Sequence, residues 1–246
     1  MPGLTILVTG GSSASGIATA RALGAAGHKV FTVGSDDARI KAAADDAGSG
    51  VTPMVCDLAS YNAVRELAHG LTRRGVDRVD GVIHLVGGWR GAKGIEDQSD
   101  EDWDAMERGA ITTLRNVSRV FYSQIAASPH GRLAMISSTA VSSPTAAAAS
   151  YAASKAAAEA WTLAVADGFR RAQAEGRAET QHQPEDLHSA AVIFVVKALV
   201  DPAMRAAHPE RRFPGYTDVE DLAAAVVGLF EEPAANLNGQ RILLAK

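Results

Sequence analysis

Two side chains spaced four residues apart could together exchange a proton. Tyr151 and Lys155 lie in a segment rich in helix-forming residues, where this spacing places both side chains on one face of a helix. A free tyrosine has a pKa of about 10 and is a poor acid-base catalyst near neutrality, but a neighbouring ammonium group favours the phenolate. An ordinary packing pair is the commoner use of such a spacing. The pair therefore predicts a proton relay only if other features of a site accompany it.

A serine hydroxyl is expected close to this pair. Ser138 follows the apolar run 133–136, which has the composition of a buried strand. Open α/β folds bind their ligands at the carboxyl ends of the strands, where this hydroxyl would lie. Serine-rich turns are common, so Ser138 gains weight only from its combination with Tyr151 and Lys155. These three residues are the candidate catalytic set.

A turn of small residues near the start of the chain is suited to binding phosphate. The run 9–17 (TGGSSASGI) follows an apolar strand candidate and leads into an amphipathic stretch. Gly10 would allow a sharp turn, Gly16 would allow close helix packing, and free N–H groups at a helix N-terminus suit a pyrophosphate. Small-residue turns also join strands to helices without binding anything, but here strand, turn and helix occur in order. We predict a dinucleotide site that includes Gly10, Ser12, Ser13, Gly16 and Ile17.

The elements that must position these residues alternate along the chain. Short apolar runs typical of strands recur, and longer stretches with helical periodicity lie between most of them. This alternation predicts a doubly wound, Rossmann-type α/β fold, with a parallel sheet covered by helices on both faces. The predicted strands are 4–8, 29–33, 51–55, 81–86, 133–136, 191–196 and 241–244, and the predicted helices are 17–26, 63–74, 101–126, 154–174 and 219–230.

Length and composition set the remaining bounds. With 246 residues and 47% hydrophobic content, the chain can bury one large core, so we expect a single domain over residues 1–246. A net charge of −4 gives no reason to expect nucleic acid or an anionic membrane as a partner. The single cysteine, Cys56, excludes an intrachain disulfide, and the seven histidines show no metal-ligand spacing, so no metal site is predicted.

Two further segments bear on location and organisation. The N-terminus lacks a signal-peptide pattern, and Lys155 and Glu159 interrupt the alanine-rich stretch, so we expect a cytoplasmic protein with no membrane span. The region 170–189 is rich in Arg, Glu, Gln and His, and we interpret it as a helix end followed by a solvated excursion.

The glycine turn and the Ser–Tyr–Lys set together resemble the short-chain dehydrogenase/reductase family. The turn is similar to the family's Thr-Gly-x-x-x-(Gly or Ala)-x-Gly pattern with Ala14 at the middle small position, and the separation from Ser138 to Tyr151 is similar too. The resemblance covers residues 4–244. It implies an NAD(P)-dependent oxidoreductase that transfers hydride to or from a small carbonyl, alcohol or quinonoid substrate. Ser138 would hold the substrate oxygen, and Lys155 would also bind the nicotinamide ribose.

The same resemblance suggests further cofactor contacts and an assembly. Gly34 occupies the position of the acidic residue that would favour NAD, and Ser35 could donate to a phosphate, so NADP is slightly favoured over NAD. Asp57 and Leu58 resemble the segment that recognises the adenine edge, although Asp57 could equally cap a helix. Gly87 and Val200 would also contact the cofactor. The family usually forms homodimers or homotetramers, and the small side chains of 152–160 would allow close packing between subunits.

Several positions depart from the family pattern. The usual Asn-Asn-Ala-Gly reads His84-Leu85-Val86-Gly87, the helix asparagine is replaced by Ala110, and Lys197-Ala198 replaces a Pro-Gly pair. Lys197 could contact an anionic group, although a solvated lysine is the commoner case. The segments 86–91 and 189–204 resemble quinonoid dihydropteridine reductase. These departures keep two alternatives open, an NAD(P)-binding sensor with little turnover and a related reaction such as epimerisation or dehydration. For Asp36 and Asp37, helix capping is the preferred interpretation.

Overall fold

Seven parallel strands form the central sheet of this chain. The computed structural model describes residues 3–180 and 187–244. The strand order is β3-β2-β1-β4-β5-β6-β9, and each neighbouring pair is parallel. The predicted doubly wound α/β fold is therefore confirmed. The strands are β1 (Thr5–Thr9), β2 (Lys29–Gly34), β3 (Val51–Val55), β4 (Gly81–His84), β5 (Gly131–Ser138), β6 (Ser189–Val196) and β9 (Arg241–Leu243).

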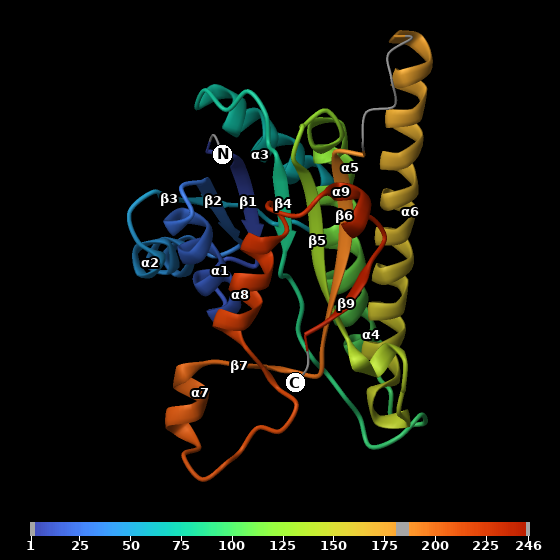
Figure 1. Cartoon of the computed structure of the whole chain (residues 1–246). Coiled ribbons are helices and arrows are strands. Elements are labelled where there is room, and N and C mark those ends of the chain that lie inside the picture. Colours follow the sequence, from blue (N-terminus) through green and yellow to red (C-terminus); the bar gives the residue numbers. More distant parts are fainter. Residues whose placement is uncertain (1–2, 181–186, 245–246) are drawn as a thin grey trace.

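Helices cover both faces of the sheet because successive strand residues face opposite ways. Ile6 and Val8 of β1 pack into a core with α1 and α8, whereas Leu7 between them packs into a core with α3, α5 and α6. Figure 1 shows α1 and α8 on one side of the sheet and α5 and α6 on the other. The helices are α1 (Ala14–Ala25), α2 (Asp37–Ala47), α3 (Tyr61–Arg73), α4 (Asp100–Glu107), α5 (Thr113–Ala126), α6 (Ala149–Thr180), α7 (Pro202–Ala207), α8 (Val219–Gly228) and α9 (Ala234–Leu237).

Some elements differ from those predicted. A π-helical turn, η1 (Arg108–Thr112), divides the predicted helix 101–126 into α4 and α5. Helix α6 runs from Ala149 to Thr180, so the predicted helix 154–174 ends six residues too early, because the Ala, Glu and Arg residues after 174 are good helix formers. Residues 181–186 of that predicted excursion lie outside the described residues. The small elements η2 (Thr139–Val141), η3 (Ala146–Ala148), β7 (Leu199–Val200) and β8 (Thr217–Asp218) were not predicted.

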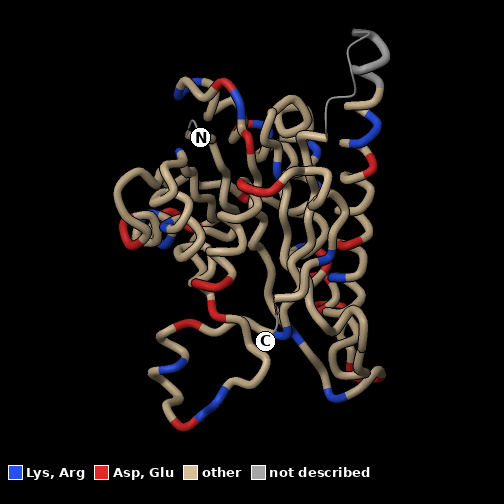
Figure 2. The backbone as a smooth tube through the Cα atoms, viewed as in Figure 1, with Lys and Arg blue, Asp and Glu red and all other residues tan. Residues whose placement is uncertain are grey.

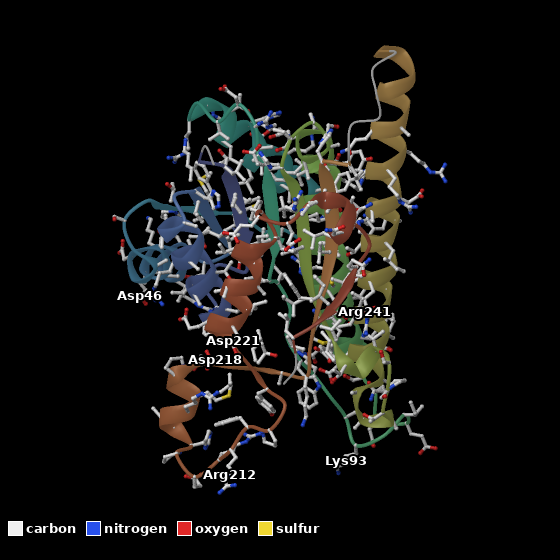
Figure 3. All side chains as sticks on the ribbon, in the orientation of Figure 1. Asp46, Lys93, Arg212, Asp218, Asp221 and Arg241 are labelled. Atoms are coloured by element: carbon white, nitrogen blue, oxygen red, sulfur yellow. The ribbon has the colours of Figure 1, made fainter. Side chains whose placement is uncertain are left out.

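The chain leaves β1 toward β2 and β3 on one side and later toward β4, β5 and β6 on the other. This change of direction creates the crevice in which open α/β sheets bind ligands, at the carboxyl ends of β1 and β4. Two long segments project beyond that edge of the sheet, one carrying Lys93 and the other carrying α7 and Arg212 (Figures 1 and 3).

Charged residues of both signs are interspersed along the helices and loops (Figure 2). Of the helices in the described ranges, none has the length and apolarity that crossing a membrane would need. Within the same residues, no three His, Cys, Asp or Glu side chains are grouped so that they could hold a metal ion.

Candidate active site

A cavity of about 960 Å³ opens at the carboxyl edge of the sheet. Of the predicted catalytic and cofactor-binding residues, Ser13, Gly87, Ser138, Tyr151 and Lys155 line it, and so does Lys197, the possible contact to an anionic group. The structure thus brings part of the predicted phosphate-binding turn and the Ser–Tyr–Lys set to one cavity. The sequence interpretation did not assign the other lining side chains to the site, and these include Ser15, Leu85, Ala140, Ser143, Ala148 and Leu199.

Strand β5 and helix α6 position the three candidate catalytic side chains. Ser138 is the last residue of β5, and its Oγ accepts a hydrogen bond from the Ala140 N–H at 3.1 Å. Tyr151 lies in the first turn of α6, and its side chain hydrogen-bonds with that of Ser138. The Lys155 ammonium, one helical turn further along, donates to the Ile136 carbonyl at 2.9 Å. All three side chains line the cavity.

Burial controls the protonation of this set. Desolvation raises the pKa of Tyr151, and the hydrogen bond with Ser138 only partly opposes that rise. The sequence predicted that the Lys155 ammonium group lowers the pKa of Tyr151. The structure shows a shift in the other direction, because the tyrosine is largely buried and Lys155 is itself desolvated. Burial lowers the pKa of Lys155 to about 8, and the charge of Glu159 acts in the opposite direction. At neutral pH the site holds a neutral tyrosine beside an ammonium group.

The glycine turn folds back on itself around Ser13. The Ser13 side chain caps α1 by accepting from the Gly16 N–H at 3.0 Å and donates to the Gly10 carbonyl at 2.8 Å. Gly10 has a φ of +74°, and a Cβ there would lie 2.7 Å from the Leu85 carbonyl group. A Cβ on Gly11 would come within 1.8 Å of the Thr32 hydroxyl. Glycine is therefore required at both positions, because the turn packs directly against the Leu85 backbone and the Thr32 side chain.

Other predicted cofactor contacts lie outside the cavity lining. The Ile17 N–H donates to the Ser13 carbonyl at 2.9 Å, and the Ile17 side chain packs against the core. Ser12 is part of the turn, and Ser35 is exposed directly after β2. Val200 is buried in β7, so its neighbours Ala198 and Leu199 face the cavity instead.

Asp57 does not cap a helix. Its carboxylate accepts from the Ala59 N–H at 3.0 Å and pairs with Arg108 at 2.9 Å, while Ser60 caps α3 by accepting from the Ala63 N–H. The capping alternative is therefore wrong for Asp57, whereas Asp36 does cap α2 as expected, by accepting from the Arg39 N–H. The capping interpretation is wrong for Asp37, which is the first residue of α2 and pairs with Lys41 instead. Adenine recognition by Asp57 and its buried neighbour Leu58 stays a prediction.

A buried histidine occupies the first of the departing positions. His84 ends β4, and its ring nitrogens lie 2.8 Å from the Thr9 hydroxyl and 3.1 Å from the Thr113 hydroxyl. Thr113 in turn donates to the Gly109 carbonyl in the π-helical turn, where Ala110 is buried. Burial, together with the charge of Lys155, lowers the pKa of His84 to about 3. His84 therefore stays neutral and connects β1 and β4 to the interrupted helix.

The third departure from the family pattern, Lys197-Ala198, lies at the cavity. Lys197 lines it beside Val196 and Met204, and the Lys197 ammonium donates to the Pro214 carbonyl at 3.1 Å. Trp89 lines the cavity from the other projecting segment and is 66% exposed, which leaves its ring free to meet a ligand. These residues bring both projecting segments to the site.

Comparison with known proteins identifies the class that this fold and cavity define. The family model described as short chain dehydrogenase matches residues 4–174, and the chain belongs to that family. A curated relative, the NADP-dependent 3-hydroxy acid dehydrogenase YdfG of Salmonella typhi, is 28% identical over 150 residues. That match covers 61% of this chain and 60% of the length of the relative.

Solved structures share the whole fold at low sequence identity. NAD+-bound xylitol dehydrogenase has a TM-score of 0.80 and 18% identity, covering 99% of this chain and 98% of that one. An NADPH-bound short chain oxidoreductase from Pseudomonas aeruginosa PAO1, described as containing an atypical catalytic center, has a TM-score of 0.81 and 18% identity over 99% and 97% of the two chains. The expected homo-oligomer stays a prediction.

Proposed function

We propose that the protein reduces or oxidises a small carbonyl, alcohol or quinonoid substrate by hydride transfer, using Ser138, Tyr151 and Lys155. The observation that carries this proposal is the convergence of these side chains on one cavity with the phosphate-binding turn. A module that only bound a dinucleotide would have no need of the two hydroxyl groups and the ammonium group beside it.

The protonation states support an assignment of roles. Tyr151 is neutral near pH 7 because burial raises its pKa, so in the reductive direction it donates its proton to the substrate oxygen. Ser138 holds that oxygen through its hydroxyl. Lys155 binds the nicotinamide ribose and, as a cation, stabilises negative charge that develops on the tyrosine oxygen. The cofactor, when bound, supplies or accepts the hydride.

The turn at residues 10–16 fits a diphosphate. The close packing of Gly10, Gly11 and Gly16 holds the turn against the sheet, and α1, whose N-terminus can attract an anion, begins within it. We propose NADP as the preferred cofactor, because Ser35 can donate to a phosphate and Gly34 offers no carboxylate to a ribose. The NADP dependence named for the curated relative supports the same choice.

Calorimetry with NADH and NADPH, followed by turnover assays, tests the proposal. The assay panel contains ketones, quinones, quinonoid dihydropterin and a 3-oxo acid, with Tyr151→Phe as the matched variant because it removes only the hydroxyl. We expect both proteins to bind the cofactor, NADPH more tightly, and turnover in the variant to fall by roughly 10²- to 10⁴-fold. Binding without turnover by the unaltered protein on every substrate would contradict the proposal, as would the absence of cofactor binding.

A further inference from the structure

A buried carboxylate lies one helical turn beyond Lys155 on α6. Glu159 is 8% exposed, although charged residues of this kind are rarely buried unless they are paired. Its Oε1 accepts a hydrogen bond from the Ser137 hydroxyl. Its two carboxylate oxygens lie 3.2 and 3.1 Å from Nε of Arg241. The carboxylate thus connects three elements that meet behind the candidate active site.

Both partners of Glu159 are adjacent to the catalytic set. Ser137 directly precedes Ser138 at the end of β5. Arg241 is the first residue of β9, and its Nη2 lies 3.5 Å from the Ser138 carbonyl. Figure 3 shows Arg241 on β9, on the side of the sheet edge that faces α6. The carboxylate and the guanidinium group therefore hold the strand end that carries Ser138 against the helix that carries Lys155.

Few charged groups surround Lys155. Glu159 and Tyr151 share its helix, His84 faces it from β4, and Arg241 reaches the far side of Glu159 from β9. Strand β5 adds Arg132, which lies at its opposite end and is bonded to backbone carbonyls. Lys197, directly after β6, lines the same cavity and donates to the Pro214 carbonyl. The π-helical turn adds Arg108, which is paired with Asp57. Among these groups, Glu159 is the carboxylate that opposes the desolvation of the ammonium group.

We propose that Glu159 is a positioning residue for the catalytic set, and that Arg241 moderates its charge. The carboxylate keeps Lys155 in its ammonium form and fixes the strand end that holds Ser138. The guanidinium group shares the carboxylate and so limits its effect on the lysine. The positioning role rests on the proposed function of Tyr151 and Lys155 in turnover. The effect of Glu159 and Arg241 on the charge of Lys155 does not depend on that function and can be tested without a substrate.

The titration of Lys155 can be measured directly in the protein without cofactor. NMR of lysine labelled with ¹³C at Cε and ¹⁵N at Nζ gives the midpoint, and Lys155→Met assigns the signal. We expect Glu159→Gln to lower the midpoint by roughly 1 pH unit, because it removes the opposite charge and keeps the shape. We expect Arg241→Met to raise the midpoint, because the carboxylate then acts on the lysine without a competing cation. Arg241→Lys should stay close to the unaltered protein.

Shifts of the Lys155 midpoint in opposite directions in Glu159→Gln and Arg241→Met distinguish this role from a merely structural one. Loosened packing would move Lys155 in the same direction in both variants, and that result, or no movement in either, would overturn the proposal. If Glu159→Gln fails to fold, the difference between Arg241→Met and Arg241→Lys still decides the electrostatic part. A raised midpoint in Arg241→Met alone would support it, and equal midpoints would overturn it.

Turnover provides the second readout. In Glu159→Gln, the alkaline limb of kcat/KM should move to lower pH together with the NMR midpoint, and Arg241→Met should move it to higher pH. A changed kcat with an unmoved pH profile would overturn the positioning role. If the NMR midpoints move as expected but the unaltered protein turns over no substrate, the proposed function fails while the electrostatic relation of Glu159 to Lys155 stands.

Discussion

Charged side chains are buried in different surroundings at the two ends of the strands of the central sheet, here called its amino edge and its carboxyl edge. At the amino edge, Arg132 is 2% exposed and donates to four backbone carbonyls, those of Gly131, His188, Leu229 and Glu232, at 2.6 to 3.0 Å. At the carboxyl edge, Lys155 is 6% exposed, donates to one backbone carbonyl at 2.9 Å and borders a cavity of about 960 Å³. The arginine is enclosed by the backbone, whereas the lysine faces a space large enough for a ligand.

This difference indicates what each charge does. The guanidinium group satisfies carbonyls at the starts of β5 and β6 and at the end of α8, so it contributes to stability by closing that edge of the sheet. Burial lowers both pKa values, that of Lys155 to about 8 and that of Arg132 to about 10, but the ammonium group has fewer compensating contacts. A buried charge that is poorly compensated costs stability, and such costs are concentrated at sites of chemistry.

Lys155→Met should produce the largest effect, a loss of activity without a loss of stability. Turnover should fall by roughly 10³-fold, because the tyrosine loses the cation that stabilises its developing charge. The free energy of unfolding at pH 7 should stay the same or rise by up to about 3 kcal/mol, since the folded state disfavours the charged lysine relative to the unfolded chain. Steady-state kinetics and urea denaturation measure the two quantities. A loss of stability comparable to that of a core substitution would contradict the comparison.

Arg132→Met should show the reverse behaviour. The variant leaves several buried carbonyls without a donor, so we expect the free energy of unfolding to fall by about 3 kcal/mol. The activity of the remaining folded protein should stay near that of the unaltered chain, because the cavity is at the other edge. Arg73→Met on the exposed face of α3 is the control, with an expected change within about 0.5 kcal/mol. Equal stability of the two variants would show that Arg132 is not part of the closure of the sheet.

The sequence predicted those features of the site that depend on residues close together in the chain. The period of the strands, the turn around Ser13, the cap at Asp36 and the helical spacing of Tyr151 and Lys155 all depend on residues within a few positions of one another. These features could therefore be predicted, and the fold class followed from the alternation of strands and helices.

Contacts between distant parts of the chain escaped prediction. The pairing of Glu159 with Arg241 joins residues 82 positions apart and exists only because β9 lies beside β6. The direction of the pKa shift of Tyr151 depends on how deeply the side chain is buried, which the spacing to Lys155 does not indicate. The π-helical turn before Thr113 likewise has no local signal, since residues 101–126 read as one continuous helix.

The smallest expected effect concerns His84. This residue combines features of both edges, because hydroxyl groups enclose its ring, as the backbone encloses Arg132, and yet it faces Lys155. Its pKa in the folded chain is about 3, below the ordinary value of 6.5, so protonation favours the unfolded state. Its contribution to stability is therefore complete above pH 6.5 and is lost as the pH falls toward 3. At pH 5 we expect a loss of about 2 kcal/mol relative to pH 7.

His84→Asn keeps hydrogen-bonding groups but removes the titration, so it should be less stable at pH 7 and should lose less stability on acidification. Urea denaturation at pH 7, 6 and 5 measures this slope. His28→Asn is the matched control, because the pKa of His28 is also lowered by burial but that residue is only partly enclosed at the amino edge. If His28→Asn reduced the loss of unfolding free energy between pH 7 and pH 5 more than His84→Asn did, the amino edge would be the more acid-sensitive one. That result would contradict the expected contrast between the two edges for acid sensitivity.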